Sequence, residues 1–176
     1  MQEFEALVTR THEVGLKVVL DFVPNHVARQ YHSDTAPEGV DDLGAHDNKE
    51  MHFSPSNNFY YIPRQAFTPQ FYIGEGEDRY FEYPAKATGN DCFGAFPGEY
   101  DWYETVKLNY GVDYTGGGRC HFDPIPDTWY KMLDILLFWC GKGVDAFRCD
   151  MAHMVPVEFW NWAISKVKGN YPSVIF

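Results

Sequence analysis

The chain has 176 residues, of which 45% are hydrophobic, and this is enough to bury one well-packed core. Its 25 acidic residues outnumber its 14 basic ones, for a formal net charge of −11, and such a surface argues against a nucleic-acid partner. No apolar run approaches the roughly 18 residues of a membrane span, and no signal-like segment stands at the N-terminus, so the cellular location stays open.

The chain opens with a predicted helix followed by a predicted strand. Residues 2–14 have a helical apolar period that ends at Gly15, and residues 16–23 form an almost continuous apolar run. Such a run is typical of a parallel strand that is covered on both faces. The apolar face of the helix is expected to comprise Phe4, Leu7, Val8, Thr11 and Val14.

The last 50 or so positions repeat this alternation. A second helix begins at Asp127 and ends at Gly141, and a strand over 144–149 follows at once. Pro156 opens a third helix, and residues 174–176 begin another strand. Strands that alternate with helices predict a parallel sheet with right-handed crossovers. The predicted inward residues of the last two helices are Trp129, Met132, Leu133, Leu136, Leu137 and Cys140, then Trp160, Ala163, Ile164 and Val167.

The segment between these two parts is too long for an ordinary connection. It is rich in Tyr, Phe, Gly, Pro and Asn and shows little helical period. We therefore predict an α/β protein in three segments: 1–26, an irregular inserted subdomain over 27–126, and 127–176.

The four cysteines do not indicate a zinc site, because they contain no C-x-x-C pair and no histidine at metal spacing. Cys140 and Cys149 are expected to be small buried hydrophobic residues. Cys92 and Cys120 lie in the irregular middle of the chain, where they are either free or joined in a disulfide.

Polar and charged residues follow two of the predicted strands. The first cluster runs from Asp21 to Asn25 and His26, and the second is Arg148-Cys149-Asp150. Active sites of α/β proteins are built just past strand ends. Because strand side chains repeat every second residue, Arg148 and Asp150 project to the same face. Taken alone, such a cluster could also be a structural ion network.

In this order the two motifs resemble those of the alpha-amylase family of glycoside hydrolases, family 13. That family has a D-x-x-x-N-H block after its third barrel strand and a G-F-R-x-D block, ending in the nucleophile, after its fourth. Residues 106–109, Val-Lys-Leu-Asn, are similar to the M-P-K-L-N block of neopullulanase-like members. The resemblance covers the chain nearly end to end. It implies part of a TIM (β/α)8 barrel, from third to fifth strand, with domain B inserted after the third strand.

The resemblance also implies a role for each motif residue. Asp150 would be the catalytic nucleophile, and Arg148 would hold it charged and oriented. Asp21 would accept from Arg148 and lie on the substrate side, and His26 would bind hydroxyls of the sugar. Asn25 would be a ligand of a structural calcium ion through its amide oxygen, a type of ligand that calcium prefers. No organic cofactor is expected.

The implied substrate is an alpha-1,4-glucan, namely starch, glycogen or a maltooligosaccharide, and transglycosylation stays open beside hydrolysis. Many alpha-amylases have a Lys-His pair at the third and fourth positions after the nucleophile. Here these positions are His153 and Met154, so His153 is the candidate sugar contact there. Asp91, Trp102 and Tyr103 are candidate walls of the cleft, and an aromatic content of 18% suits stacking against sugar rings.

The family's general acid, a Glu after the fifth strand, and its third carboxylate near the seventh have no counterpart in these residues. We therefore expect the 176 residues alone to lack useful hydrolase activity. Because their strand edges are unprotected, we also expect them to self-associate or to be only marginally stable. One alternative is a catalytically silent glucan-binding or partner-subunit member of the same fold. Another is a parallel α/β domain with unrelated chemistry. The intact Arg148 and Asp150 favour the enzyme.

Overall fold

The computed structural model describes residues 1–32, 37–72 and 80–176. They form two compact units, the first made of Met1–Pro24 with Trp129–Phe176 and the second of Asn25–Thr128. The boundaries lie close to those expected from the sequence. However, Asn25 and His26 belong to the second unit and not to the segment that carries Asp21.

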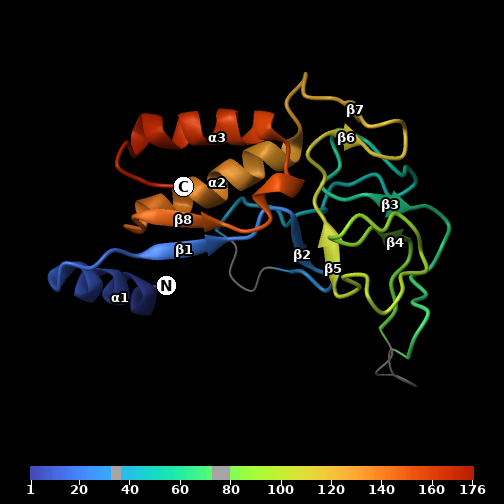
Figure 1. Cartoon of the computed structure of the whole chain (residues 1–176), viewed down its shortest axis with the longest axis horizontal. Coiled ribbons are helices and arrows are strands. Elements are labelled where there is room, and N and C mark those ends of the chain that lie inside the picture. Colours follow the sequence, from blue (N-terminus) through green and yellow to red (C-terminus); the bar gives the residue numbers. More distant parts are fainter. Residues whose placement is uncertain (33–36, 73–79) are drawn as a thin grey trace. The chain divides into compact units, whose positions relative to one another are not determined.

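The first unit is built on a parallel strand pair, β1 (Val19–Phe22) with β8 (Ala146–Cys149), drawn side by side in Figure 1. Asp21 is the Cα partner of Arg148 in this register. A parallel bridge between Ala146 and Ile175 adds a third segment, on the other edge of β8. The strand predicted over 16–23 is thus shorter than expected, although its parallel pairing is as predicted.

Two long helices cover this pair: α2 (Asp127–Gly141) and α3 (Val157–Asn170). Pro156 is the residue before the first helical position of α3, where its fixed φ favours a helix start. The ring of Trp129 meets that of Phe159 edge to face, with the centroids 5.7 Å apart. The buried side chains of the two helices are Trp129, Met132, Leu133, Leu136, Cys140, Phe159, Ala163 and Val167. The predicted face of α2 is therefore largely correct, whereas that of α3 lacked Phe159.

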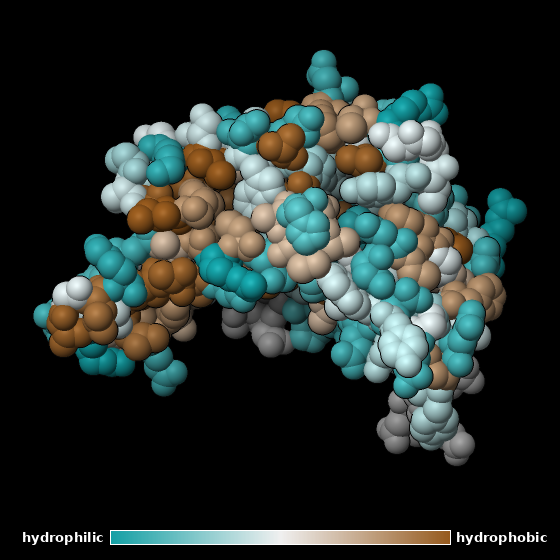
Figure 2. Space-filling model, viewed as in Figure 1, coloured by the Kyte–Doolittle hydropathy of each residue, from teal (hydrophilic) through white to brown (hydrophobic). Residues whose placement is uncertain are grey.

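The first helix, α1 (Gln2–Glu13), buries only Val8 among its residues. Phe4 packs on Trp139 at 4.9 Å between centroids, and Val8 is buried, but Leu7 is 49% exposed. The predicted apolar face of this helix was thus only partly right. Hydrophobic side chains gather on the surface at this end of the unit in Figure 2, where Leu7, Val14 and Leu16 are exposed.

The second unit consists of short antiparallel pairs joined by irregular segments. They are β2 (His26–Ala28) with β5 (Thr105–Lys107), β3 (Tyr61–Ile62) with β4 (Ala85–Lys86), and β6 (Val112–Asp113) with β7 (Arg119–Cys120). One hydrophobic cluster of this unit combines Ile62, Phe67, Ala85 and Ala95, with Tyr80 and Tyr103 packed against them. Every polar backbone group in so irregular a unit needs a partner, and buried side-chain amides supply many of them.

The cysteines are all free, so the disulfide between Cys92 and Cys120 is not formed. Cys140 is buried as predicted, and Cys149 is half-buried. Over the described ranges, no helix has both the length and the apolar character needed to cross a membrane.

Candidate active site

Three charged side chains meet on one face of the β1–β8 pair. Nη1 of Arg148 lies 3.1 Å from Oδ1 and 3.2 Å from Oδ2 of Asp21, and 2.8 Å from Oδ1 of Asp150. The pKa of Arg148 is raised, chiefly by its hydrogen bond to Asp21 and further by the attraction of both carboxylates. The side chain of Asp150 is 24% exposed, against 58% for Asp21, so Asp150 is the more enclosed carboxylate.

The backbone holds Asp150 in place at the end of β8. Its N–H donates to the carbonyl of Phe22 at 2.9 Å, which continues the β1–β8 ladder by one residue. The next residue, Met151, has a φ of +48°, a left-handed conformation that turns the chain away sharply. A short 3-10 helix, η2 (Ala152–Met154), follows, and Trp160 donates to the carbonyl of Ala152 at 3.1 Å. That bond ties the turn to α3.

His153 lies in η2 and is exposed. The sequence placed it three residues past Asp150, and η2 keeps the two on one short connection. Of the candidates from the sequence, the first unit thus brings together Asp21, Arg148 and Asp150, with His153 in the adjoining turn.

In the second unit, the amide of Asn25 is held in one orientation. Its Nδ2 donates to the carbonyl of Gly89 at 2.8 Å and lies 3.2 Å from Nδ1 of His26. An amide nitrogen only donates, so Nδ1 of His26 accepts, and a neutral His26 carries its proton on Nε2. The ring of His26 lies 5.4 Å from that of Trp102 between centroids, in a tilted arrangement.

The amide oxygen of Asn25 is bound by a lysine. Nζ of Lys107 lies 2.9 Å from Oδ1 of Asn25 and 2.6 Å from Oδ1 of Asp91. The Lys107 side chain is 2% exposed, and burial lowers the pKa of Lys107 in spite of the hydrogen bond and attraction of Asp91. Sequence reasoning singled out Lys107 only as a member of the Val-Lys-Leu-Asn block. Its burial and its partners depend on contacts across 82 positions.

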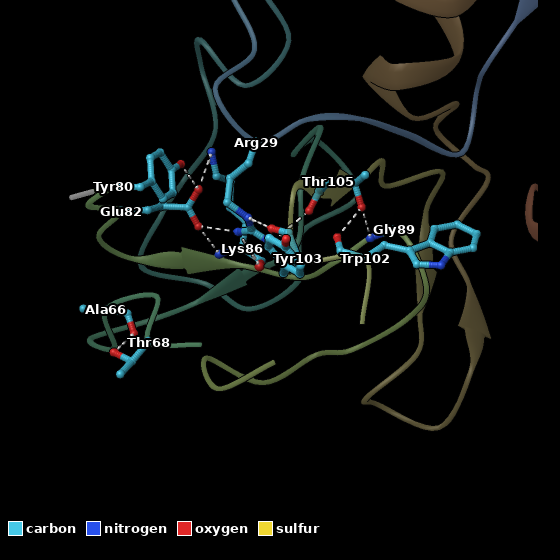
Figure 3. Close-up of polar contacts among 10 residues, drawn as sticks. All are labelled: Arg29, Ala66, Thr68, Tyr80, Glu82, Lys86, Gly89, Trp102, Tyr103 and Thr105. Carbon is cyan, nitrogen blue, oxygen red and sulfur yellow. Dashed lines mark hydrogen bonds and ion pairs between the residues drawn. The ribbon is translucent and has the colours of Figure 1, made fainter. Parts of the chain in front are cut away.

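Gly89 allows the backbone to approach His26 closely. A Cβ at this position would lie 2.7 Å from Oγ1 of Thr105 and 2.9 Å from Cβ of His26. Oγ1 of Thr105 accepts from the N–H of Gly89 at 2.9 Å and donates to the carbonyl of Trp102 at 2.7 Å, two contacts that are drawn in Figure 3. These bonds connect Gly89 and Trp102, both of which lie next to His26. Sequence reasoning did not find Gly89, because no motif marks it.

A buried ion network anchors β2 next to His26. Arg29 contacts Glu82 at 2.7 Å, and the two side chains are 4% and 7% exposed. Arg29 contacts Oε1 of Glu82, whereas Oε2 accepts from the hydroxyl of Tyr80 at 2.8 Å and lies 3.2 Å from Nζ of Lys86 (Figure 3). Arg29 donates in addition to the carbonyls of Tyr103, Lys86 and Thr105. Every charge in this network is thus paired, as burial requires.

The three candidate cleft walls differ in what they contact. Asp91 pairs with Lys107, and Trp102 lies against His26. Tyr103 lines a hollow of about 460 Å³ beside Arg29 and Phe67. Whether any of them touches a sugar stays a prediction.

The surroundings of Asn25 do not fit a divalent metal ion. The amide oxygen that calcium would need accepts from the ammonium of Lys107, and the nearby Asp91 carboxylate pairs with the same ammonium. Within the described part of the chain, no group of three or more His, Cys, Asp or Glu side chains could hold a metal ion.

No family model matches this sequence. It is similar, however, to an alpha-1,4-glucan:maltose-1-phosphate maltosyltransferase of Cereibacter sphaeroides, with 46% identity over 86 residues. That match covers 46% of this chain and 14% of the relative, so the chain corresponds to a small part of that enzyme.

Two solved structures are similar over almost the whole chain. One is an alpha-amylase from Lactobacillus plantarum, with a TM-score of 0.51, 24% identity and coverage of 98% of this chain and 27% of that one. The other is a cyclic alpha-maltosyl-(1→6)-maltose hydrolase from Arthrobacter globiformis in complex with maltose. It has a TM-score of 0.55 and 18% identity, and the match covers 98% of this chain and 30% of that one. At these identities the likeness shows the fold.

Proposed function

The chain is part of an alpha-amylase-family domain, and on that basis we propose that it carries the nucleophile of a retaining alpha-glucan-active enzyme. In this proposal β1 and β8 are the third and fourth strands of a (β/α)8 barrel, and residues 174–176 begin the fifth. The second unit is then domain B. The observation that carries the proposal is the bridge of Arg148 between Asp21 and Asp150.

Asp150 suits the nucleophile because one guanidinium nitrogen holds one of its oxygens at 2.8 Å. A charge-assisted hydrogen bond of this kind fixes the direction of the carboxylate. The other oxygen is then the one that attacks the anomeric carbon. Asp21 accepts from the same nitrogen and so keeps the guanidinium from turning away. Arg148 is accordingly a positioning residue.

The proposed reaction has two steps. First, an oxygen of Asp150 forms a bond to the anomeric carbon as the bond to the leaving oxygen breaks, and a general acid gives that oxygen a proton. Second, an acceptor O–H attacks the anomeric carbon and releases the Asp150 carboxylate, while its proton returns to the former acid. None of these 176 residues matches the family's acid, so we propose that they do not hydrolyse glucan by themselves.

His26 is proposed to bind a hydroxyl of the sugar, on the grounds of its position in the motif and of the proton carried by its Nε2. A neutral imidazole with this tautomer donates from Nε2 to a sugar hydroxyl, because Asn25 occupies Nδ1. His153 is proposed as a further sugar contact because it is exposed in the turn after Asp150.

The acceptor in the second step separates hydrolysis from transfer. Water gives hydrolysis of an alpha-1,4 bond, and the hydroxyl of a second glucan gives a longer chain. The Cereibacter relative is named for maltosyl transfer from maltose 1-phosphate to alpha-1,4-glucan. Maltose 1-phosphate is therefore a candidate donor for the intact protein that contains this segment, beside the alpha-1,4-glucan that a hydrolase would cleave.

The test compares that intact protein with its Asp150→Asn variant on maltoheptaose and on maltose 1-phosphate with glycogen. We expect activity on at least one donor and a loss of several orders of magnitude in the variant. Asp134→Asn is the matched control, since Asp134 is exposed on α2. A ring-fluorinated maltosyl fluoride, which reacts slowly, should leave its fluorinated maltosyl group on Asp150. Mass spectrometry of the peptide that contains Asp150 would detect the added mass. Glucan binding without turnover of any donor would support the silent-binder alternative.

A further inference from the structure

We propose that the buried ammonium of Lys107 takes the place of a divalent metal ion in this domain and, through Asn25, fixes the orientation of His26. The first part concerns the folded unit alone. The second part rests on the proposed function, because it assigns His26 to substrate.

The contacts of Lys107 are those of a bound cation. Its Nζ touches a carboxylate oxygen of Asp91 and an amide oxygen of Asn25, and the ring of Tyr114 lies 5.3 Å from it. Oxygen ligands of these two kinds are the ones that hard metal ions select. The lysine is supplied by β5, whose register places it opposite His26 on β2. Folding of the β2–β5 pair therefore delivers the cation to its ligands.

The groups around Nζ of Lys107 also carry the right net charge for a monovalent cation. Lys107 and Asp91 neutralise each other, and Asn25 is neutral. A divalent ion in the same place would lie beside a buried ammonium, and like charges at such short range repel strongly in a protein interior. The ammonium and the metal ion therefore exclude one another at this position.

The ammonium determines the orientation of the Asn25 amide. With Oδ1 turned to Lys107, Nδ2 faces the carbonyl of Gly89 and Nδ1 of His26. Turning the amide over would put its NH2 group against the ammonium and its oxygen against the Gly89 carbonyl. Lys107 thus acts on His26 by way of Asn25, as a positioning residue that contacts no substrate.

The first test is thermal unfolding of the intact protein with a chelator and with added Ca²⁺. We expect the same Tm in both conditions for the wild type. The outcome that would overturn the proposal has two parts. The Tm of the wild type falls with the chelator and recovers with Ca²⁺, and the Asn25→Ala variant no longer shows that recovery. This measurement does not depend on enzyme activity, so failure of the proposed function leaves it intact.

The second test removes the charge with Lys107→Met, which keeps the length of the side chain. We expect Tm to fall by about 5 °C or more, because the buried Oδ1 of Asn25 is left without its hydrogen-bond donor and Asp91 loses its ion pair. Lys49→Met is the matched control, since Lys49 is exposed in the same unit. Equal stability of the Lys107→Met and Lys49→Met proteins would contradict a structural role for the ammonium.

The third test reads the tautomer of His26 directly from its ring ¹⁵N shifts at neutral pH. We expect a bare, accepting Nδ1 in the wild type and a mixture of tautomers in any Lys107→Met protein that folds. In steady-state kinetics, that variant is expected to raise KM more than it lowers kcat. A wild-type His26 with its proton on Nδ1 would refute the link through Asn25, whatever the stability measurements give.

Discussion

Arg148 and Asp21 are Cα partners on neighbouring parallel strands, and Nη1 of Arg148 lies within 3.2 Å of both oxygens of the Asp21 carboxylate. Partners in register project to the same face of a sheet, so the contact follows from the strand pairing. Asp150 joins them because it stands two residues after Arg148 and its N–H continues the ladder to β1.

Asp21→Asn tests whether this pairing positions the nucleophile. The variant keeps the shape of the side chain but removes the charge that holds Arg148. We expect kcat/KM to fall roughly 10–100-fold in the intact protein, because a small displacement of a reacting group is costly. Initial rates on the active donor provide the measurement, with Asp134→Asn as the control. Unchanged kcat/KM would mean that Arg148 is held by other contacts.

Gly89→Ala tests the close approach to His26. The added methyl group would lie 2.9 Å from Cβ of His26 and 2.7 Å from Oγ1 of Thr105, so His26 or β5 must move. We expect a lower Tm and a reduction of kcat/KM of about tenfold or more. Gly94→Ala is the control, because nothing lies within 4 Å of a Cβ there. Equal Tm and kcat/KM values for the two variants would mean that the close approach at Gly89 does not constrain His26.

Glu82→Gln tests the buried network at Arg29. It leaves the guanidinium of Arg29, 4% exposed, without a charged partner, and we expect the free energy of unfolding to fall by about 3–5 kcal/mol. Denaturant unfolding measures the difference against Glu99→Gln, an exposed control in the same unit. A loss below about 1 kcal/mol, as for a surface pair, would argue that water reaches Arg29.

Asp145 gives the first unit a pH-dependent contribution to stability. Burial raises the pKa of Asp145, but hydrogen bonds from the Val18 N–H, Lys17 and His12 outweigh it and hold the pKa well below its usual range. A carboxylate with a depressed pKa stabilises the fold above its unfolded pKa, near about 4, and stops doing so as pH falls through the folded value.

We therefore expect Asp145→Asn to lower the free energy of unfolding at pH 7 by about 1–2 kcal/mol, the range of a hydrogen-bonded charge that is partly exposed. The difference from wild type should shrink as pH drops below about 4. Urea unfolding at a series of pH values measures it. A difference that stays constant down to pH 2 would contradict the assignment.

We also propose that the 176 residues self-associate when produced alone. Val19 and Ile175 are 59% and 64% exposed, and both are partners of Ala146, so they share one face of the sheet. Light scattering should show a mass that rises with concentration, and replacing both residues by Thr should reduce it. A constant monomer mass across the concentration range would count against this.

The elements of the first unit could be predicted because their signals are local. The 3.6-residue period of α2 identified its buried face, and the apolar runs before Asp21 and Asp150 identified β1 and β8. Leu7 was misplaced because α1 is covered along only part of its length, and a periodic pattern does not say how much of a face is covered.

The second unit could not be derived in the same way. Its strands are two or three residues long, so no alternation of polar and apolar residues is long enough to read. Lys107 illustrates the difficulty, because a lysine is ordinarily expected at the surface and here is buried by partners distant in the chain. Gly89 and Arg29 likewise gain their importance from contacts that sequence spacing does not reveal.

The strand that carries the proposed nucleophile is bonded on both edges. Phe147 donates its amide hydrogen to Ile175, while Asp150 donates to Phe22 on the opposite side. Exchange of these hydrogens with deuterium requires that β8 separate from two neighbours, whereas an edge strand has to leave only one. In a deuterium-labelling experiment, β8 is therefore expected to exchange among the slowest segments of the first unit. The hydrogen bonds that position Asp150 should therefore stay formed during local unfolding events in which α1 is already exposed to solvent.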